Sequence, residues 1–391
     1  MTSTVPRVPR ILFIHNTAVW YRRPFFRRLS QVYDVRFVFT HLQVQRDEYG
    51  VDISENIEGM EGVTYRVCKS HLGIPTGLIP ELLWGGFELI VDSFGTRWSV
   101  PSFLIAKLRR KPILLWSEDW GWRGKSLKGL FIPAVIRFLV SHSDAMLVPG
   151  TKHKEYLVSL GGSGEKVFIM PNASNLVIDR NDYQEKERVR DNLHIGANNV
   201  VLYVGRLAKQ KGVDYLLQAF CRVRREAENV VLLIIGEGEC RSELEALSKS
   251  LNIDSCVHFI GAVDNEKLVP YYLLCDVCVV PSVSVTHGMG DRWVFVVNEA
   301  MLCGKPVIAT DAVGAAFDMI KNGVNGFMVP ERNVDALYRA MRTVLGDSEL
   351  SLKMGEESRR MVEGGFTYEH MIAGLKQAVE YVRVVKEDCG R

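Results

Sequence analysis

The sequence lacks a strong net charge, a long apolar run and a regular cysteine spacing. Its 391 residues carry 48 Lys and Arg against 46 Asp and Glu, a formal net charge of +2, so the total charge does not indicate a nucleic-acid-binding protein. No 18 apolar residues run uninterrupted, and residues 1–9 contain no apolar segment of the kind found in signal peptides. We therefore expect neither a membrane-spanning helix nor export, and we expect a cytoplasmic protein.

The eight cysteines are scattered through apolar runs, which favours a reducing compartment over a disulfide-bonded secreted fold. Cys275 and Cys278 form the only C-x-x-C pair. The apolar residues around them are typical of a buried strand, and no second Cys or His pair has a matching spacing. We therefore predict packing rather than zinc binding, and we expect no metal and no other cofactor.

The composition is that of a chain that folds throughout. Hydrophobic residues make up 47% and charged residues 24%, without the low hydrophobicity or high net charge of disordered proteins. The charge is nevertheless uneven: residues 1–175 hold 22 Lys and Arg against 15 Asp and Glu, and residues 176–391 hold 26 against 31. This distribution favours the first half as the place where an anionic partner would bind.

Short apolar runs alternate with amphipathic stretches in two separate series, which is typical of parallel sheets with right-handed helical crossovers. The first series is expected at residues 10–14, 35–40, 89–91, 113–116 and 145–148, and the second at 199–204, 230–235, 257–260, 277–280, 307–309 and 326–329. We therefore predict an α/β protein with two doubly wound, Rossmann-like domains.

The domain boundary is expected near a charged stretch without strand pattern, residues 172–198. We assign residues 1–175 to the first domain and 176–369 to the second. A final helix, about 370–391, is long enough to cross back to the first domain.

The second domain opens with a strand that ends in Gly205, followed by a loop that holds Arg206 and Lys211 and leads into a helix. Cations near a helix N-terminus at the carboxyl end of a strand are suited to a phosphate group. The next strand also ends in a glycine, Gly236, which lets the backbone approach a ligand closely. The alternative is that both cations lie on a solvated turn.

Two carboxylates stand eight residues apart, Asp291 in a loop and Glu299 in the early turns of a helix expected over residues 296–302. A carboxylate there is compatible with the helix dipole and can bind ligand hydroxyls. The alternative for Glu299 is an acid on the helix surface.

In their order and spacing, these segments resemble the retaining glycosyltransferases of family GT4, which have the GT-B fold: two Rossmann-like domains that face each other across a cleft. The resemblance covers about residues 199–345 strongly and the rest by architecture. It implies that Arg206 and Lys211 bind the diphosphate of a nucleotide-sugar donor, that Glu299 binds the ribose and that Asp291 binds the transferred sugar. The donor-binding residues implied in this way are Gly205, Arg206, Lys211, Gly236, Phe259, Asp291, Trp293, Val294 and Glu299.

The sequence departs from the family pattern at three places. Asp291 replaces a glutamate, and Val294 replaces a glycine, where a β-branched side chain would restrict φ. Many relatives have a histidine at the end of the fourth or fifth strand of the first domain, whereas here Glu118 and Asp119 follow the strand at 113–116. These two acids and Asp291 are the catalytic candidates, and the alternative for the pair is that of ordinary loop acids.

Arginines and aromatic residues gather after the first strand of the first domain. Residues there and after the strand at 113–116 are candidates for contact with an acceptor or a membrane: His15, Tyr21, Arg22, Arg23, Arg27, Arg28, Trp122 and Arg123. The basic and aromatic side chains fit an anionic membrane surface, an anionic or soluble sugar acceptor, or a merely solvated basic face. Nucleic acid ranks last, because no RNA-binding module is present and the second half is acidic.

We therefore expect a hexosyltransferase that moves a sugar from a nucleotide-diphosphate sugar to an acceptor hydroxyl with retention of anomeric configuration. The resemblance implies no required metal. The expected acceptor is a lipid-linked sugar or glycan precursor, met at the cytoplasmic face of the membrane. The alternatives are a catalytically weak or inactive GT-B protein that binds nucleotide sugars, and a sugar-nucleotide epimerase.

Overall fold

The computed structural model describes residues 8–40, 57–68, 70–71, 74–75, 77–94, 98–120, 131–284 and 290–388. It divides the chain into two compact units. Of the described residues, unit 1 holds those up to Asp119, those from 131 to Pro171, and those from Tyr368 onward. Unit 2 holds Asn172–Thr367 and Trp120. The boundary thus lies within a few residues of the predicted one at 175.

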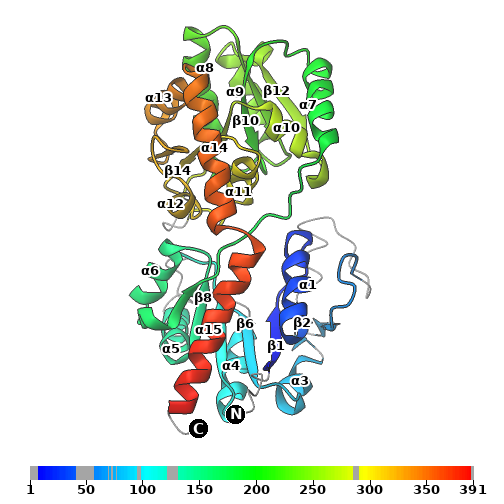
Figure 1. The fold of residues 1–391 in the computed structure, drawn as a ribbon. Coiled ribbons are helices and arrows are strands. Elements are labelled where there is room, and N and C mark those ends of the chain that lie inside the picture. Colours follow the sequence, from blue (N-terminus) through cyan, green and yellow to red (C-terminus); the bar gives the residue numbers. More distant parts are fainter. Residues whose placement is uncertain are drawn as a thin grey trace. The chain divides into compact units, whose positions relative to one another are not determined.

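Unit 1 is built on a seven-stranded parallel sheet with the order β3-β2-β1-β6-β7-β8-β9 (Figure 1). The strands are β1 (Arg10–His15), β2 (Asp34–Phe39), β3 (Tyr65–Val67), β6 (Leu89–Ser93), β7 (Ile113–Trp116), β8 (Ala145–Val148) and β9 (Val167–Ile169). The short strands β4 (Ser70–His71) and β5 (Ile74–Pro75) form a separate antiparallel pair. The central strands are buried on both faces, as their continuous apolar runs predict.

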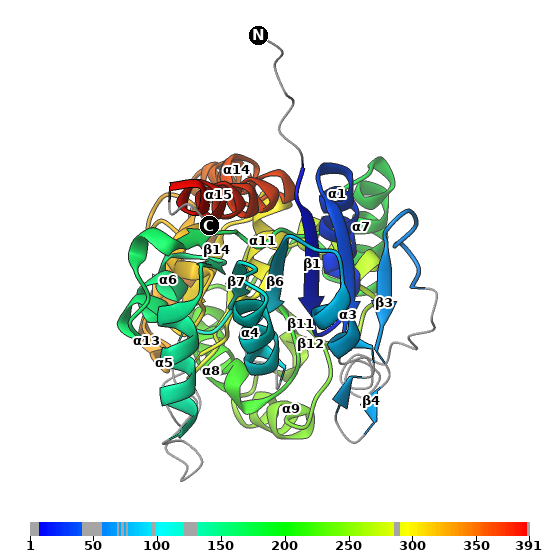
Figure 2. The same ribbon diagram turned by 90° about the horizontal axis from the view of Figure 1, so that it is seen from below.

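The helices of unit 1 cover both faces of this sheet (Figure 2). They are α1 (Arg23–Val32), α3 (Leu78–Trp84), α4 (Ser99–Leu108), α5 (Phe131–His142), α6 (Thr151–Ser159) and α15 (Tyr368–Asp388). The connection from β1 to β2 leads toward one edge of the sheet. The connections from β6 to β7 and from β7 to β8 lead toward the other edge. Since crossovers are right-handed, α1 lies on one face with α15, and α4 and α5 lie on the other with α3.

The last helix, α15, returns to unit 1 as predicted, and contacts α1, β8 and β9. Its Gly374 lies so close to β9 that a Cβ atom would come within 2.2 Å of the carbonyl oxygen of Ile169. At the other end, the Tyr368 hydroxyl donates a hydrogen bond of 2.8 Å to the carbonyl of Tyr21. The helix is therefore an integral part of unit 1.

Unit 2 has a six-stranded parallel sheet with the order β12-β11-β10-β13-β14-β15. Its strands are β10 (Asn199–Val204), β11 (Val230–Ile235), β12 (Val257–Gly261), β13 (Val277–Val280), β14 (Val307–Thr310) and β15 (Gly326–Val329). Its helices are α7 (Arg180–Asn192), α8 (Val213–Glu226), α9 (Arg241–Ser250), α10 (Val269–Leu274), α11 (Phe295–Leu302), α12 (Ala316–Met319), α13 (Val334–Leu345) and α14 (Ser348–Gly365). The prediction of two doubly wound domains is confirmed.

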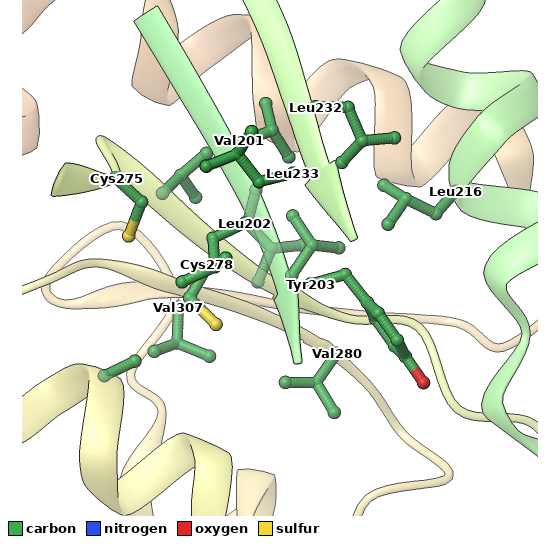
Figure 3. Close-up of a cluster of buried hydrophobic side chains, with 14 of the residues drawn as sticks. Val201, Leu202, Tyr203, Leu216, Leu232, Leu233, Cys275, Cys278, Val280 and Val307 are labelled. Carbon is green, nitrogen blue, oxygen red and sulfur yellow. The ribbon is translucent and has the colours of Figure 1, made fainter. Parts of the chain in front are cut away.

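The core of unit 2 lies between its central strands and the helices that pack on them (Figure 3). Cys275 and Cys278 are both buried in it, beside Val201 and Leu202. The thiols therefore pack, as the apolar run around them predicts. Burial raises the pKa of Cys275 to about 12, which leaves its thiol protonated at neutral pH.

Candidate functional site

The carboxyl ends of β10 and β11 approach each other so closely that they require glycine. Gly236 has φ of +137°, and a Cβ atom on it would lie 2.0 Å from the carbonyl oxygen of Gly205. The Gly205 amide donates to Ile235, and the Gly236 amide donates to Gly261 at the end of β12. Three neighbouring strands thus end together, and their loops form one edge of unit 2.

The loop after β10 carries the two predicted phosphate-binding cations to this edge. Arg206 is exposed, and its carbonyl accepts a hydrogen bond of 2.9 Å from the buried Tyr203 hydroxyl. Lys211 ends a 3-10 turn directly before α8. Gly212, at φ of +63°, follows it and lies against the carbonyl of Pro281 after β13. The loop is therefore fixed at both ends, and Lys211 lies at a helix N-terminus, where a bound anion is stabilised.

Asp291 lies next to Lys211, with 2.8 Å between Oδ2 and Nζ. The Ser282 hydroxyl donates to the same carboxylate oxygen. The backbone of Asp291 is held on the turn after β14, because its amide donates to Ala312 and its carbonyl accepts from Gly314. The structure thus brings together a predicted diphosphate ligand and a predicted sugar ligand.

Two residues of this cluster were not predicted from the sequence. Burial raises the pKa of the Tyr203 hydroxyl well above its usual value, the nearby Asp291 carboxylate raises it further, and Arg206 opposes both effects. The charges of Asp291 and Arg206 therefore both act on Tyr203, at the base of the cluster. Ser282 follows β13 and is buried. A serine or tyrosine near a strand end is too common to indicate such a role by itself.

Glu299 lies on α11 and is only 4% exposed, so it is not an acid on the helix surface. The Tyr272 hydroxyl donates to its Oε2 over 2.7 Å. Burial raises the pKa of the Glu299 carboxyl to about 7, although the hydrogen bond from Tyr272 opposes this shift. Glu299 is therefore a mixture of protonated and ionised forms near neutral pH, and it is held by a buried side chain from α10.

Trp293 and Val294 lie directly before α11. The Trp293 indole donates 2.9 Å to Asn298, whose amide donates 3.0 Å to the carbonyl of Asn172 in the linker. The Trp293 side chain is buried against the core of unit 2, and its predicted part in donor binding stays a prediction. Val294 precedes α11 in an extended conformation, φ −100° and ψ 106°, which suits a β-branched residue. The replacement of glycine at this position therefore causes no backbone strain.

Phe259 lies on the edge strand β12 and is partly buried against the core. The Arg241 guanidinium on α9 donates to the Phe259 carbonyl over 3.4 Å and forms an ion pair with Glu237. Glu237 directly follows Gly236 after β11. The ion pair of Arg241 and Glu237 therefore lies at the carboxyl edge of the sheet, beside the backbone of residues 259–261.

In unit 1, His15 ends β1 and is buried beside Trp116, with 5.1 Å between the ring centroids. The Thr17 amide donates to its Nδ1 over 3.1 Å. Burial lowers the pKa of His15 to about 4, and the Arg22 guanidinium contributes to this shift. His15 is therefore neutral at pH 7.

Arg22 is buried, with 3% of the residue exposed, so its charge does not lie on an open surface, and of its two predicted roles contact with an acceptor stays a prediction. It forms an ion pair with Glu118, and its guanidinium carbon lies 4.6 Å from the Trp116 ring centroid. Glu118 is partly exposed, and Asp119 donates its amide to the Ser117 hydroxyl. The two predicted catalytic acids of unit 1 thus lie at the carboxyl end of β7.

Each of the other arginines near α1 lies near a polar or acidic group. Arg23 donates to the carbonyl of Ala18. Arg23 and Arg27 lie near enough to Glu61 for their charges to lower the pKa of that carboxyl, after the larger effect of hydrogen bonds from backbone amides. Arg28 pairs with Glu369 over 3.3 Å.

The aromatic side chains of this segment contribute little exposed surface. Phe25 and Phe26 are fully buried, and Tyr21 is half-buried. Of the three interpretations of residues 20–28, an exposed basic-aromatic surface is therefore the one that this packing does not favour, and contact with an acceptor stays a prediction. Trp122 and Arg123 lie outside the described residues.

Part of the chain is similar to known proteins. Residues 184–361 match the family model described as "Glycosyl transferases group 1". An uncharacterized glycosyltransferase of Methanocaldococcus jannaschii is 29% identical over 66% of this chain and 64% of its own length. A GDP-mannose-dependent alpha-(1-6)-phosphatidylinositol monomannoside mannosyltransferase of Mycobacterium tuberculosis is 25% identical over 62% of this chain and 63% of its own length. The matched segments thus span somewhat less than two thirds of both relatives.

The whole chain also has a structural neighbour. Anabaena Alr3699/HepE, solved in complex with UDP and glucose, matches with a TM-score of 0.70 and 18% identity, over 95% of this chain and 99% of that one. This likeness shows that the fold is shared.

Proposed function

We propose that this chain, which has the GT-B fold, is a group 1 glycosyl transferase that transfers a hexose from a nucleotide-diphosphate sugar to an acceptor hydroxyl with retention. The observation that carries the proposal is the cluster of Arg206, Lys211 and Asp291 at the carboxyl edge of the unit 2 sheet. It combines cations for a diphosphate with a carboxylate for sugar hydroxyls.

The cations act on the leaving group. When the bond between the anomeric carbon and the donor phosphate breaks, its electron pair moves to the phosphate oxygen, where negative charge grows. Lys211, Arg206 and the amides at the start of α8 are fixed before the reaction and stabilise that charge. Under the proposal, the acceptor oxygen forms the new bond on the same face, and its proton goes to the departing phosphate.

Under the proposal, Asp291 exchanges its hydrogen-bond partners when the donor binds. In the structure its carboxylate accepts from Lys211 and Ser282. A bound diphosphate competes for Lys211, and Asp291 is then available to accept hydrogen bonds from the transferred sugar. Glu299 is the proposed ligand of the ribose, since a carboxyl with a pKa near 7 can both donate and accept hydrogen bonds.

The proposed acceptor is a lipid-linked sugar or glycan precursor. The Mycobacterium tuberculosis relative is named for action on phosphatidylinositol monomannoside, which supports a lipid acceptor for a protein of this family. Glu118 and Asp119 are the proposed residues that face the acceptor hydroxyl in unit 1.

A donor panel tests the proposal. Purified protein is incubated with UDP-, GDP- and ADP-sugars, and binding, slow donor hydrolysis and transfer products are measured for the wild type and for Arg206→Ala. Binding of one donor class that is weakened by Arg206→Ala supports the proposal. If no donor binds and Arg206→Ala changes nothing, the proposal fails.

Two alternatives give different results in the same panel. An inactive binding protein, which the Asp291 replacement of glutamate suggests, binds a donor without turnover at any acceptor. A sugar-nucleotide epimerase converts its donor to an epimer when no acceptor is present, which chromatography of the nucleotide sugars detects.

A further inference from the structure

More of the large exposed apolar side chains of unit 1 lie on the face covered by α3, α4 and α5 than on the face of α1 and α15, where Val32, Val384 and Val385 are exposed. Those on α3, α4 and α5 are Ile79, Trp84, Val100, Leu104, Leu108, Val135 and Phe138. The three helices lie side by side on the same face of the sheet (Figure 2). In the described part of unit 2, by contrast, exposed side chains of this kind are scattered over the linker, α7, a turn and α14.

The exposed side chains of α4 form a continuous stripe. Val100, Leu104 and Leu108 are spaced four residues apart, so they lie on one side of the helix, and Leu108 is 80% exposed. The stripe continues onto α5, because the Phe103 ring on α4 contacts the Phe138 ring, with 5.7 Å between their centroids.

Trp84 extends the same surface from α3. It is 76% exposed at the end of that helix. Arg109, which follows Leu108, donates to the carbonyls of Leu82 and Gly85 on either side of Trp84, and so ties the ends of α3 and α4 together. We refer to Trp84, Val100, Leu104, Leu108, Val135 and Phe138 as the apolar face.

The charged residues that border the apolar face are mostly cations. Neither α4 nor the described sequence of α5 contains an acidic residue. The basic residues there are Lys107, Arg109, Arg110, Lys111, Arg137 and, from α15, Lys386. Among the described residues, Lys107 pairs with Asp144 over 2.8 Å, and no ion pair to a carboxylate is found for the other five.

These cations act on one another at the end of α4. Burial lowers the pKa of the Lys386 ammonium, the charges of Lys111 and Lys107 lower it further, and Asp144 opposes them. The Lys386 ammonium also donates 3.0 Å to the carbonyl of Arg110. A cluster of like charges on a surface is stabilised by an anionic partner.

We propose that the apolar face docks on an anionic lipid surface, with its apolar side chains in the interfacial layer and its bordering cations against the lipid head groups. Exposed aliphatic side chains, a tryptophan and a border in which cations outnumber acids are what such a surface binds. A second copy of the chain is a poorer occupant, because the same face of a partner offers no acidic residue on α4 or on the described sequence of α5 to pair with these cations. The inference extends the proposed function, since a lipid-linked acceptor is met at a membrane, but it rests on its own observations.

Vesicle co-sedimentation tests the proposal with the full chain. The probes are phosphatidylcholine vesicles with and without about 30% phosphatidylserine, at low and at high salt. We expect binding that requires phosphatidylserine and weakens with salt. Leu104→Ser combined with Leu108→Ser should lower the partition coefficient about tenfold or more, and Arg110→Ala combined with Lys111→Ala about tenfold.

Matched variants in unit 2 are the controls. Leu352→Ser removes a similarly exposed leucine on α14, and Arg225→Ala with Arg339→Ala removes two exposed arginines. Each should bind vesicles as the wild type does. Circular dichroism of each variant checks that it folds.

Three results would overturn the proposal: no binding of the wild type to anionic vesicles, equal binding of both apolar-face variants, or a dimer in light scattering that the leucine variant abolishes. Donor binding and hydrolysis are measured without vesicles, so failure of the proposed function is seen separately. If the protein turns over a donor but does not bind vesicles, only the docking is contradicted. If the protein binds vesicles through the apolar face but neither binds nor turns over any donor, only the transfer is contradicted.

Discussion

Lys211 and Asp291 are 80 residues apart in the sequence, and their charged groups lie 2.8 Å apart at the edge of the unit 2 sheet. The pair satisfies both charges while no donor is bound. It also means that a diphosphate must replace the Asp291 carboxylate at Lys211. Removal of the Lys211 charge should therefore lower the affinity for the free nucleoside diphosphate, whereas removal of the Asp291 charge should not lower it.

Lys211→Ala should lower kcat/KM for the donor about 100-fold or more, because a fixed cation at the leaving group is lost. The measurement is steady-state kinetics with the donor found in the panel. Lys209→Ala is the matched control, since Lys209 is an exposed lysine in the same turn. An effect of equal size at both positions would show that only the general positive charge of the loop matters.

Asp291→Asn should lower kcat about tenfold while the affinity for the free nucleoside diphosphate stays equal or rises, because the neutral amide no longer competes for Lys211. Calorimetry gives the affinity, and transfer kinetics give kcat. Asp311→Asn, on the exposed turn after β14, is the control and should change neither. Weaker binding of the free diphosphate to Asp291→Asn would contradict the competition.

Glu299 should make unit 2 less stable as pH rises from about 4.5 to about 7. Its pKa is raised on folding, so the folded state binds more protons than the unfolded state in that window, and the free energy of unfolding falls with rising pH. Glu299→Gln removes this dependence, and at pH 8 its relative gain in stability is of the order of 3 kcal/mol at most.

The measurement for Glu299 is urea unfolding of the wild type and Glu299→Gln at pH 5 and pH 8. Tyr272→Phe is the companion variant, because the Tyr272 hydroxyl opposes the upward shift. It should extend the pH dependence of stability to higher pH. If the free energies of unfolding of the wild type and Glu299→Gln changed equally between pH 5 and pH 8, Glu299 would not be the group that titrates.

The fold was predictable because it depends on local patterns. Buried parallel strands such as 10–14 and 199–204 are continuous apolar runs, and the alternation with helices determines the sheet type. The edge strand β3 was missed, since its three residues, Tyr65–Val67, carry no such pattern. The position of Glu299 on a helix was also local, and it was predicted.

The environment of each site residue was harder to predict, because it depends on residues far away in the sequence. Glu299 meets Tyr272 from another helix, and nothing near either residue indicates that contact. The same holds for Arg22, which lies in the densest arginine cluster of the sequence but is buried against Trp116 and Glu118. Composition showed a basic segment, and only the packing shows which of its charges reach solvent.

Arg22→Met should destabilise unit 1 by about 2 kcal/mol. Loss of a buried cation leaves its partner carboxylate uncompensated, and the cost is below that of a fully buried pair because Glu118 is partly exposed. Arg27→Met, on the exposed side of the same segment, should change stability by less than about 0.5 kcal/mol.

Urea unfolding followed by tryptophan fluorescence measures both variants, and Glu118→Gln completes a double-mutant cycle with Arg22→Met. The cycle should show a coupling of about 1 kcal/mol or more, since the two charged groups are in direct contact. If Arg22→Met were as mild as Arg27→Met and uncoupled from Glu118, Arg22 would have to lie in solvent, and the basic segment would again be a candidate for the membrane surface. A large, coupled effect instead leaves the apolar face of α3, α4 and α5 as the surface of unit 1 that is suited to lipid.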